Sequence, residues 1–189
     1  MHWFGVLCLM LAVGFAGYVV WLLWGTGLST QRAQNELREG FEQVVDTKDP
    51  SQAPVRIPLG ESYAQILIPS IGVNFMVVQG TEYEDLKLGP GHYLDTADPW
   101  DDTGRVGIAG HRTTYLHPFF NLDKVDPGDR VTLRSEFGTF DYIVDRMFVV
   151  PESGSGRVLA PTSEPTLVLT SCNPKYLSYQ RLIVTATRV

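Results

Sequence analysis

Hydrophobic and polar positions follow three different patterns along the chain. In the first, residues 3–24 form an apolar run without a charged side chain, about the length of a helix that spans the ~30 Å hydrocarbon core of a bilayer. Trp3, Trp21 and Trp24 stand at its ends, where amphipathic rings favour the headgroup zone. A cleaved signal peptide would have a basic start and a small-residue cleavage site. We therefore predict an uncleaved transmembrane anchor over residues 1–24, with a signal peptide or a buried core helix as the alternatives.

The second pattern is helical. Ser29 or Thr30 can cap a helix whose apolar positions recur at spacings of three and four, namely Ala33, Leu37, Phe41, Val44 and Val45. This predicts an amphipathic stalk helix, either packed on the folded domain or projecting from the membrane. Residues 46–58 contain three prolines among polar residues, which is typical of a semi-extended linker. The predicted division is stalk helix and linker over 25–57 and folded domain over 58–189.

The third pattern indicates strands. Short β-branched and aromatic runs are separated by Gly, Pro and Asp, and we expect strands over residues 63–68, 73–78, 106–109, 130–134, 139–150, 166–170 and 181–187. Helical turns fit residues 83–87 and 119–122. Seven or eight short strands with no long helix predict an all-β fold, either a closed or nearly closed antiparallel barrel or a sandwich.

Composition narrows the function. The 189 residues are 44% hydrophobic and carry a net charge of −6 without a run of Lys or Arg, so one domain is expected and nucleic acid is not an expected partner.

The basic residues around the apolar run bear on its orientation in a membrane. No basic residue precedes the run, whereas Arg32 and Arg38 follow it, which opposes an N-terminus inside the cell. Large domains translocate largely regardless of charge, so we still expect residues 25–189 outside the cell.

Cysteine usage points to a reactive thiol. Cys8 lies in the apolar run and Cys172 near the C-terminus, so we expect Cys172 to be free. A free thiol that faces an oxidising compartment is exposed to oxidation or mispairing, and catalysis would explain its presence. Cys172 directly follows the predicted strand 166–170, a rigid position that stays open to substrate.

Two residues could activate that thiol. His111 follows an apolar strand, and imidazole exchanges protons with both thiols and amines. Arg181 opens the last predicted strand, and its guanidinium can bind a carbonyl oxygen or the oxyanion formed from it. Taken singly, each has an ordinary explanation: a buried thiol, a surface histidine and a solvated arginine. All three lie at strand ends and suit one reaction.

These segments resemble the sortase family. Thr166-Leu-Val-Leu-Thr-Ser-Cys172, Gly110-His111-Arg112-Thr113-Thr114 and Gln180-Arg181-Leu182-Ile183-Val184 follow that family's order of His, Cys and Arg. The resemblance covers residues 60–189, includes Gly89-Pro90-Gly91-His92-Tyr93, and is greatest to class E sortases of high-GC Gram-positive bacteria. It implies an eight-stranded sortase barrel behind a single N-terminal anchor.

The resemblance also implies an activity. The expected enzyme is a cysteine transpeptidase with Cys172 as nucleophile, His111 as proton-transfer partner and Arg181 as oxyanion-stabilising charge. Its expected partners are surface proteins with a Leu-Pro-x-Thr-Gly or Leu-Ala-x-Thr-Gly sorting signal and a peptidoglycan precursor, lipid II or a stem-peptide amine. The expected substrate-binding residues are Thr170, Ser171, His92 and Tyr93, with a structural role in the barrel as the alternative for His92.

Two departures from the family pattern stand in the sequence. The signature Thr-Leu-x-Thr-Cys is replaced by Val168-Leu169-Thr170-Ser171-Cys172, which keeps a hydroxyl beside the nucleophile. The tripeptide Asp98-Pro99-Trp100 resembles the lid of pilin-polymerising sortases but lies inside the barrel sequence, so we expect a loop. The sequence stops soon after the last strand, without a C-terminal apolar segment, which favours a housekeeping-like role over pilin polymerisation.

Other functions are weighed against this one. The Ser-His-Gly-Cys run of L,D-transpeptidases and the Gln-Ala-Cys of caspases are absent. A non-catalytic, membrane-tethered β-barrel binding module is the alternative from another class. No cofactor is expected, and no metal, because Asp95, Asp98, Asp101 and Asp102 lack the spacing of an EF-hand loop.

Overall fold

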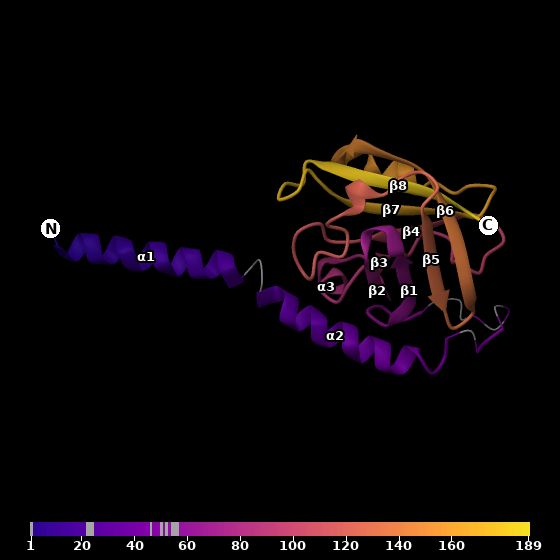
Figure 1. The fold of residues 1–189 in the computed structure, drawn as a ribbon, viewed down its shortest axis with the longest axis horizontal. Helices are drawn as coiled ribbons and strands as arrows, with labels where there is room; N and C mark the ends of the chain where they lie inside the picture. Colours follow the sequence, from indigo (N-terminus) through magenta and orange to yellow (C-terminus); the bar gives the residue numbers. More distant parts are fainter. Residues whose placement is uncertain (1, 22–24, 46, 50, 52, 54–56) are drawn as a thin grey trace.

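Two helices precede a β-barrel in the computed structural model (Figure 1). The structure describes residues 2–21, 25–45, 47–49, 51, 53 and 57–189. The helices are α1 (His2–Val20), α2 (Thr26–Phe41), α3 (Tyr83–Leu86) and the short 3₁₀ segments η3 (Pro69–Ile71), η4 (Leu122–Lys124) and η5 (Glu152–Leu159). The strands are β1 (Ser62–Ile68), β2 (Val73–Gln79), β3 (Gly91–His92), β4 (Arg105–Ala109), β5 (Arg130–Ser135), β6 (Gly138–Pro151), β7 (Thr166–Asn173) and β8 (Gln180–Arg188).

The eight strands close into one barrel in the order β1-β2-β3-β4-β7-β8-β6-β5. This confirms the predicted all-β barrel and excludes the sandwich. The expectation of purely antiparallel pairing is wrong, because β2 pairs with β3 and β4 with β7 in parallel. A parallel pair needs a long crossover connection, and the 56 residues between Ala109 and Thr166, which include β5, β6 and η5, supply the one from β4 to β7.

Alternating side chains of the strands fill the barrel. Leu167 and Leu169 of β7 and Leu182 and Val184 of β8 belong to the hydrophobic core, so the intervening residues of these strands face outward, because side chains alternate along a strand. The outer face of β7 therefore carries Cys172. Burial of the alternate leucines thus sets the direction in which the thiol points.

Three details differ from the predicted elements. Strand β7 continues to Asn173, so Cys172 lies within the strand and not after it. Strand β3 spans only Gly91–His92, too short to show a period of two. Segment η5 was not predicted, because its Gly and Ser residues indicate a loop.

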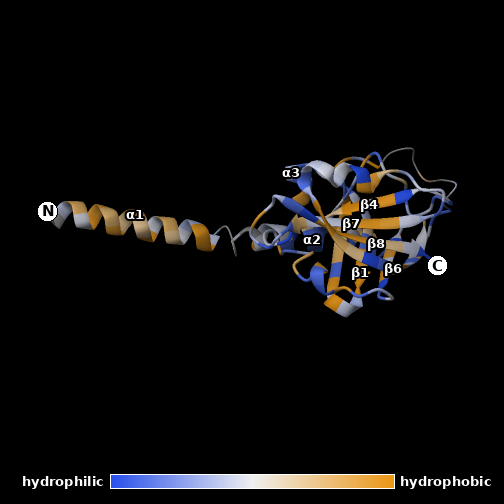
Figure 2. Cartoon of the chain, turned by 90° about the horizontal axis from the view of Figure 1, so that it is seen from above, coloured by the Kyte–Doolittle hydropathy of each residue, from blue (hydrophilic) through white to orange (hydrophobic). Residues whose placement is uncertain are grey.

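Helix α1 stands apart from the barrel and is hydrophobic along its length (Figure 2). Within the described residues, one stretch, Trp3–Val20, is long and apolar enough to cross a membrane by length and composition, and none of it is buried. Trp24, expected at the end of the anchor, lies outside the described residues.

Helix α2 packs against the barrel wall at β2. It begins at Thr26, so the predicted cap at Ser29 or Thr30 is wrong. Thr30 instead lies buried inside the helix and donates a hydrogen bond to the Lys87 carbonyl (2.8 Å). Gln34 is also buried; its Nε2 donates to the Met76 carbonyl (2.9 Å) and its Oε1 accepts from the Met76 N–H (2.7 Å). The predicted linker over residues 46–58 lies partly outside the described residues.

Candidate active site

Strand register brings two of the predicted residues together. Cys172 of β7 lies opposite Arg181 of β8 in the antiparallel pair, and opposite residues project to the same face with Cβ atoms about 4.5–5.5 Å apart. The long β6–β8 and β7–β8 ladders hold both strands. The pairing of β7 with β8 therefore makes the Cys172 and Arg181 side chains neighbours.

His111 reaches the same place through the parallel pair of β4 and β7. Ala109 lies in register with Thr170. Two hydrogen bonds continue the β4–β7 pairing beyond Ala109: the Gly110 N–H donates to the Thr170 carbonyl (3.1 Å), and Ser171 Oγ donates to the Gly110 carbonyl (2.8 Å). His111, the next residue, is thereby held beside the end of β7.

A cavity of about 240 Å³ joins these residues. Its lining includes all three predicted catalytic residues and three of the four predicted substrate-binding residues; the full lining is Thr81, Leu86, Tyr93, Ala109, Gly110, His111, Thr170, Ser171, Cys172 and Arg181. The Tyr93 hydroxyl lies 3.0 Å from Thr170 Oγ1. Residues from β4, β7 and β8 and from the segment after β3 thus surround one hollow.

The His111 ring has an unused nitrogen. Its Nε2 is buried and has no hydrogen-bond partner in the described part of the chain, and its ring lies against that of Tyr115, with centroids 4.9 Å apart. Burial lowers the pKa of His111, because a low-dielectric site disfavours the charged imidazolium. At neutral pH the ring is neutral and can accept a proton.

Arg181 is held by η5 and by its own loop. Its Nη1 donates to the carbonyls of Ser178 (2.5 Å) and Gln180 (3.0 Å), and its Nη2 pairs with the Glu152 carboxylate. Glu152 opens η5 directly after β6. Sequence reasoning missed this residue, because nothing local to Glu152 shows that β6 ends beside β8.

Arg112 is a second residue that sequence reasoning missed. Its side chain is 2% exposed, Nη2 pairs with Asp123 (2.9 Å), and the other nitrogens donate to the carbonyls of Phe120 (3.0 Å) and Cys172 (3.4 Å). It therefore fastens the loop after His111 to the strand of Cys172. Its position next to His111 was the available signal.

His92 does not reach the cavity. It is 1% exposed, its Nδ1 lies 3.0 Å from Gln79 Oε1 and its Nε2 3.1 Å from the Ala97 carbonyl. The ring stacks on Tyr63 with centroids 4.1 Å apart. This geometry does not support the predicted substrate contact, since no substrate can reach a ring enclosed in the barrel wall.

The tripeptide 98–100 lies in the loop between β3 and β4, as expected. Asp98 accepts a hydrogen bond from the Tyr63 hydroxyl (2.6 Å), and Trp100 packs against Tyr63 and Phe137. Among the residues that the structure describes, no group of three His, Cys, Asp or Glu side chains is placed to hold a metal ion. The loop is fastened to the barrel by these contacts.

The fold and the grouping of His, Cys and Arg define the class of protein. A model of the sortase domain matches residues 66–189, about two thirds of the chain, and the chain belongs to the sortase family. This confirms the predicted family.

Particular relatives fall into two groups. Sortase SrtE1 of Streptomyces coelicolor is 27% identical over 181 residues, which cover 88% of this chain but only 51% of SrtE1; the chain thus spans about half the length of that relative. Sortase E of Streptomyces avermitilis is 33% identical with a TM-score of 0.63, covering 70% of this chain and 91% of that structure. The sortase D5 transpeptidase of Clostridium perfringens is 27% identical with a TM-score of 0.74, covering 84% and 99%.

Proposed function

We propose that this chain is a membrane-anchored cysteine transpeptidase that cleaves a C-terminal sorting signal and transfers the preceding protein to a cell-wall amine. The observation that carries the proposal is that Cys172, His111 and Arg181 line one cavity in a sortase-family barrel. A thiol, an imidazole and a guanidinium around one hollow suit acyl transfer better than passive binding.

The reaction has two halves. His111 Nε2 takes the proton of the Cys172 thiol while the sulfur attacks the substrate carbonyl carbon; the C–N bond then breaks, and His111 returns the proton to the departing amine. The product is a thioester. In the second half an incoming amine loses a proton to His111, attacks the thioester carbonyl and displaces the sulfur, which regains its proton.

Arg181 supplies positive charge where negative charge develops. Its two terminal nitrogens have partners, whereas its Nε–H has none in the described part of the chain. A guanidinium offers five donors, and those that remain stabilise the oxyanion. Thr170, Ser171 and Tyr93 form the wall against which the sorting peptide lies.

The proposed substrates have a Leu-Pro-x-Thr-Gly-like or Leu-Ala-x-Thr-Gly-like signal. The amine comes from a peptidoglycan precursor, lipid II or a stem peptide. The similarity to two Streptomyces sortases E favours class E, and that to sortase D5 favours class D. In both classes the proposed reaction is the same.

We place the enzyme in the cell membrane with one span and the barrel outside. The proposed division is anchor 1–24, helix and linker 25–57, and catalytic domain 58–189. The apolar helix Trp3–Val20 supports the anchor. Helix α2, bonded to the barrel through Thr30 and Gln34, acts as a docked spacer and not as a free stalk.

The test uses the two cysteines as a matched pair. The full chain in neutral detergent is incubated with a Leu-Pro-x-Thr-Gly or Leu-Ala-x-Thr-Gly peptide, with and without glycine or diaminopimelate amines, and analysed by mass spectrometry. We expect a covalent adduct in the wild type and in Cys8→Ala, and none in Cys172→Ala. Added amine should convert the adduct to a transfer product. An adduct that persists in Cys172→Ala would remove Cys172 from its role, and its absence from the wild type would favour the binding module.

A further inference from the structure

A second cavity lies beside η5, on strands β4, β6 and β8. Its volume is about 430 Å³, larger than that of the Cys172 cavity, and the two share no lining residue. It is lined by Arg105, Arg146, Phe148, Val150, Pro151, Gly154, Arg157, Val158 and Thr185. These residues come from β4, β6, β8 and η5, and none has a part in the proposed reaction.

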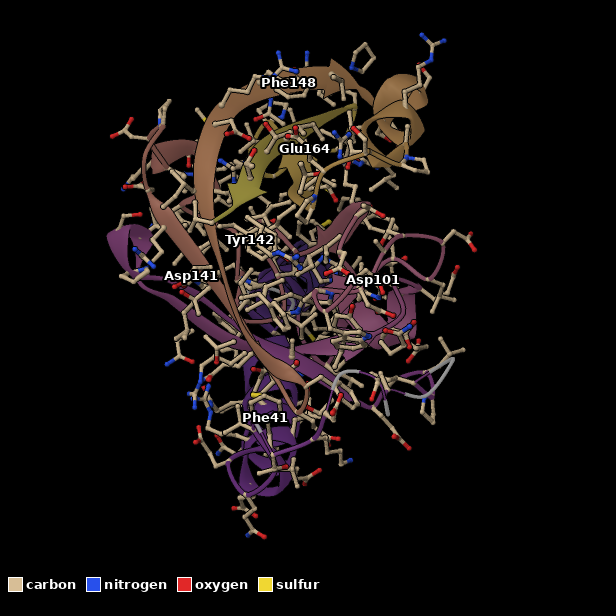
Figure 3. All side chains as sticks on the ribbon, turned by 90° about the vertical axis from the view of Figure 1, so that its right-hand side faces the viewer. Phe41, Asp101, Asp141, Tyr142, Phe148 and Glu164 are labelled. Atoms are coloured by element: carbon tan, nitrogen blue, oxygen red, sulfur yellow. The ribbon has the colours of Figure 1, made fainter. Side chains whose placement is uncertain are left out.

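Strand register places the two cavities side by side. Val150 of the second cavity lies opposite Arg181 of the first. Val168 of β7 and Ile183 of β8, the next outward positions after Thr170 and Arg181, are fully buried. Figure 3 shows Tyr142 near the middle of the barrel and Phe148 at the far end of β6. The second cavity is therefore a separate hollow next to η5.

Three guanidinium groups surround this hollow. No carboxylate lies within 4.0 Å of Arg105, Arg146 or Arg157 in the described part of the chain, although seven other basic side chains there have such a partner. The whole chain carries a net charge of −6. Three arginines without an ion-pair partner therefore form a local positive charge that is opposite in sign to the net charge of the chain. Like charges held close together repel unless an anion lies between them.

Arg105 is the most firmly held of the three. Its Nη1 donates to the Val158 carbonyl of η5 (2.6 Å) and its Nε to Thr166 Oγ1 (3.3 Å). Burial and, after it, the positive charge of Arg146 lower the pKa of Arg105. Arg146 itself lies over the Phe148 ring, 4.9 Å from its centroid. Arg105 and Arg146 are thus held by neutral partners.

The rest of the lining is largely apolar. Phe148, Val150 and Val158 are half-buried and face the hollow together with Pro151. An anion with an attached carbon skeleton would meet charge from the arginines and apolar contact from these residues. A concave site of this kind, mainly apolar with a few convergent polar groups, is typical of small-ligand sites.

We propose that this cavity binds the phosphate group of an organic phosphate ester. A phosphate group presents three or four oxygens with up to two negative charges, and it accepts paired hydrogen bonds from several guanidinium groups. A single carboxylate pairs in this way with only one guanidinium group. The carbon skeleton of the ester lies against Phe148, Val150 and Val158. A soluble ester and the headgroup of an anionic lipid share this chemistry.

The test separates these two sources. The full chain is placed in nanodiscs of neutral phosphatidylcholine, and its thermal midpoint is followed as glycerol 1-phosphate is added; a second series uses nanodiscs that contain phosphatidylglycerol. If the thermal midpoint rises with glycerol 1-phosphate, the ligand of the cavity is a soluble ester. If it rises only in nanodiscs that contain phosphatidylglycerol, the ligand is a lipid headgroup. No rise in either series overturns the proposal, as does stabilisation by hexaglutamate alone, which would indicate an acidic peptide.

Charge-matched variants locate the site. Arg146→Gln and Arg157→Gln should bind the phosphate probe about tenfold more weakly, because each removes charge-assisted hydrogen bonds. Arg32→Gln is the control, since it removes one exposed positive charge from α2 and lines neither cavity. Arg146 and Arg157 are exposed, so without probe all variants should unfold at the wild-type midpoint. Equal loss in Arg32→Gln would mean nonspecific charge attraction and would overturn the assignment.

Discussion

Two histidines stand close to the same pair of short strands but in opposite surroundings. His92 ends β3, opposite Ile108 of β4, and His111 follows two residues after β4 ends. Burial lowers the pKa of both rings, that of His92 to about 4. Both nitrogens of His92 have hydrogen-bond partners, whereas Nε2 of His111 is buried and has none among the residues that the structure describes.

This difference distinguishes the histidine that is part of the fold from the one that we propose as reactive. A buried polar atom without a partner costs free energy, and a protein retains it where the atom has another use. The partners of His92 come from the barrel wall, so its ring is part of the fold. His111 lines the same cavity as Cys172, so the thiol is the partner that we propose for its unpaired nitrogen in the reaction.

The largest expected effect is on the rate of transfer. Gln replaces His111 with a side chain of similar size that cannot exchange a proton, so we expect His111→Gln to lower the transpeptidation rate by about 10²–10⁴-fold and the free energy of unfolding by less than about 1 kcal/mol. Peptide-transfer kinetics and urea unfolding measure the two. His117→Gln, an exposed histidine of the same loop, should leave the rate unchanged; a His111→Gln rate close to that of this control would contradict the proton-transfer role.

The next largest expected effect is the contribution of His92 to the pH dependence of the free energy of unfolding. Its pKa is 6.5 when unfolded and about 4 when folded, so the unfolded state binds more protons between these values, and the free energy of unfolding falls as the pH drops from 6.5 toward 4. Between about pH 7.5 and about pH 5 we expect a loss of about 2 kcal/mol from this residue.

Urea unfolding of the wild type and of His92→Gln at both pH values measures this contribution. The variant should be less stable at the higher pH and should lose less on acidification, because Gln does not titrate. Carboxylates such as Asp98, whose pKa burial raises, remain in both proteins and cancel in the difference. Equal acid sensitivity of the two proteins would show that His92 takes up its proton as easily folded as unfolded.

The smallest effect concerns the burial of His111. The Tyr115 ring covers His111 from a loop, whereas the barrel wall encloses His92. Tyr115→Ala should raise the pKa of His111 toward 6.5, because water then solvates the charged ring, and should leave that of His92 unchanged. Nuclear magnetic resonance titration of the two rings measures both values. Tyr115→Phe keeps the ring and should not shift His111; a shift as large as that of the alanine variant would assign the effect to the Tyr83–Tyr115 hydroxyl contact instead.

Much of the fold and site could be predicted from sequence, and the exceptions have physical causes. Seven strands are long enough to show alternating apolar positions, whereas β3, at Gly91–His92, is too short for any period. His111, Cys172 and Arg181 combine suitable chemistry with strand ends and a family resemblance. Glu152 shows no such signal, because its partner Arg181 lies 29 residues away and meets it only through strand pairing.

The amino-acid sequence by itself determined the apolar N-terminal helix, the strand-rich domain and the three residue types that suit acyl transfer, because periodicity and side-chain chemistry are local properties. Only the tertiary structure decided that Cys172 shares an outer face with Arg181 and that His92 is enclosed in the barrel wall. It also decided that, within the described ranges, a nitrogen of His111 has no partner and three arginines without carboxylate partners line one cavity beside η5. Each of these depends on the register of strands distant in the chain, and register follows from the closure of the whole barrel.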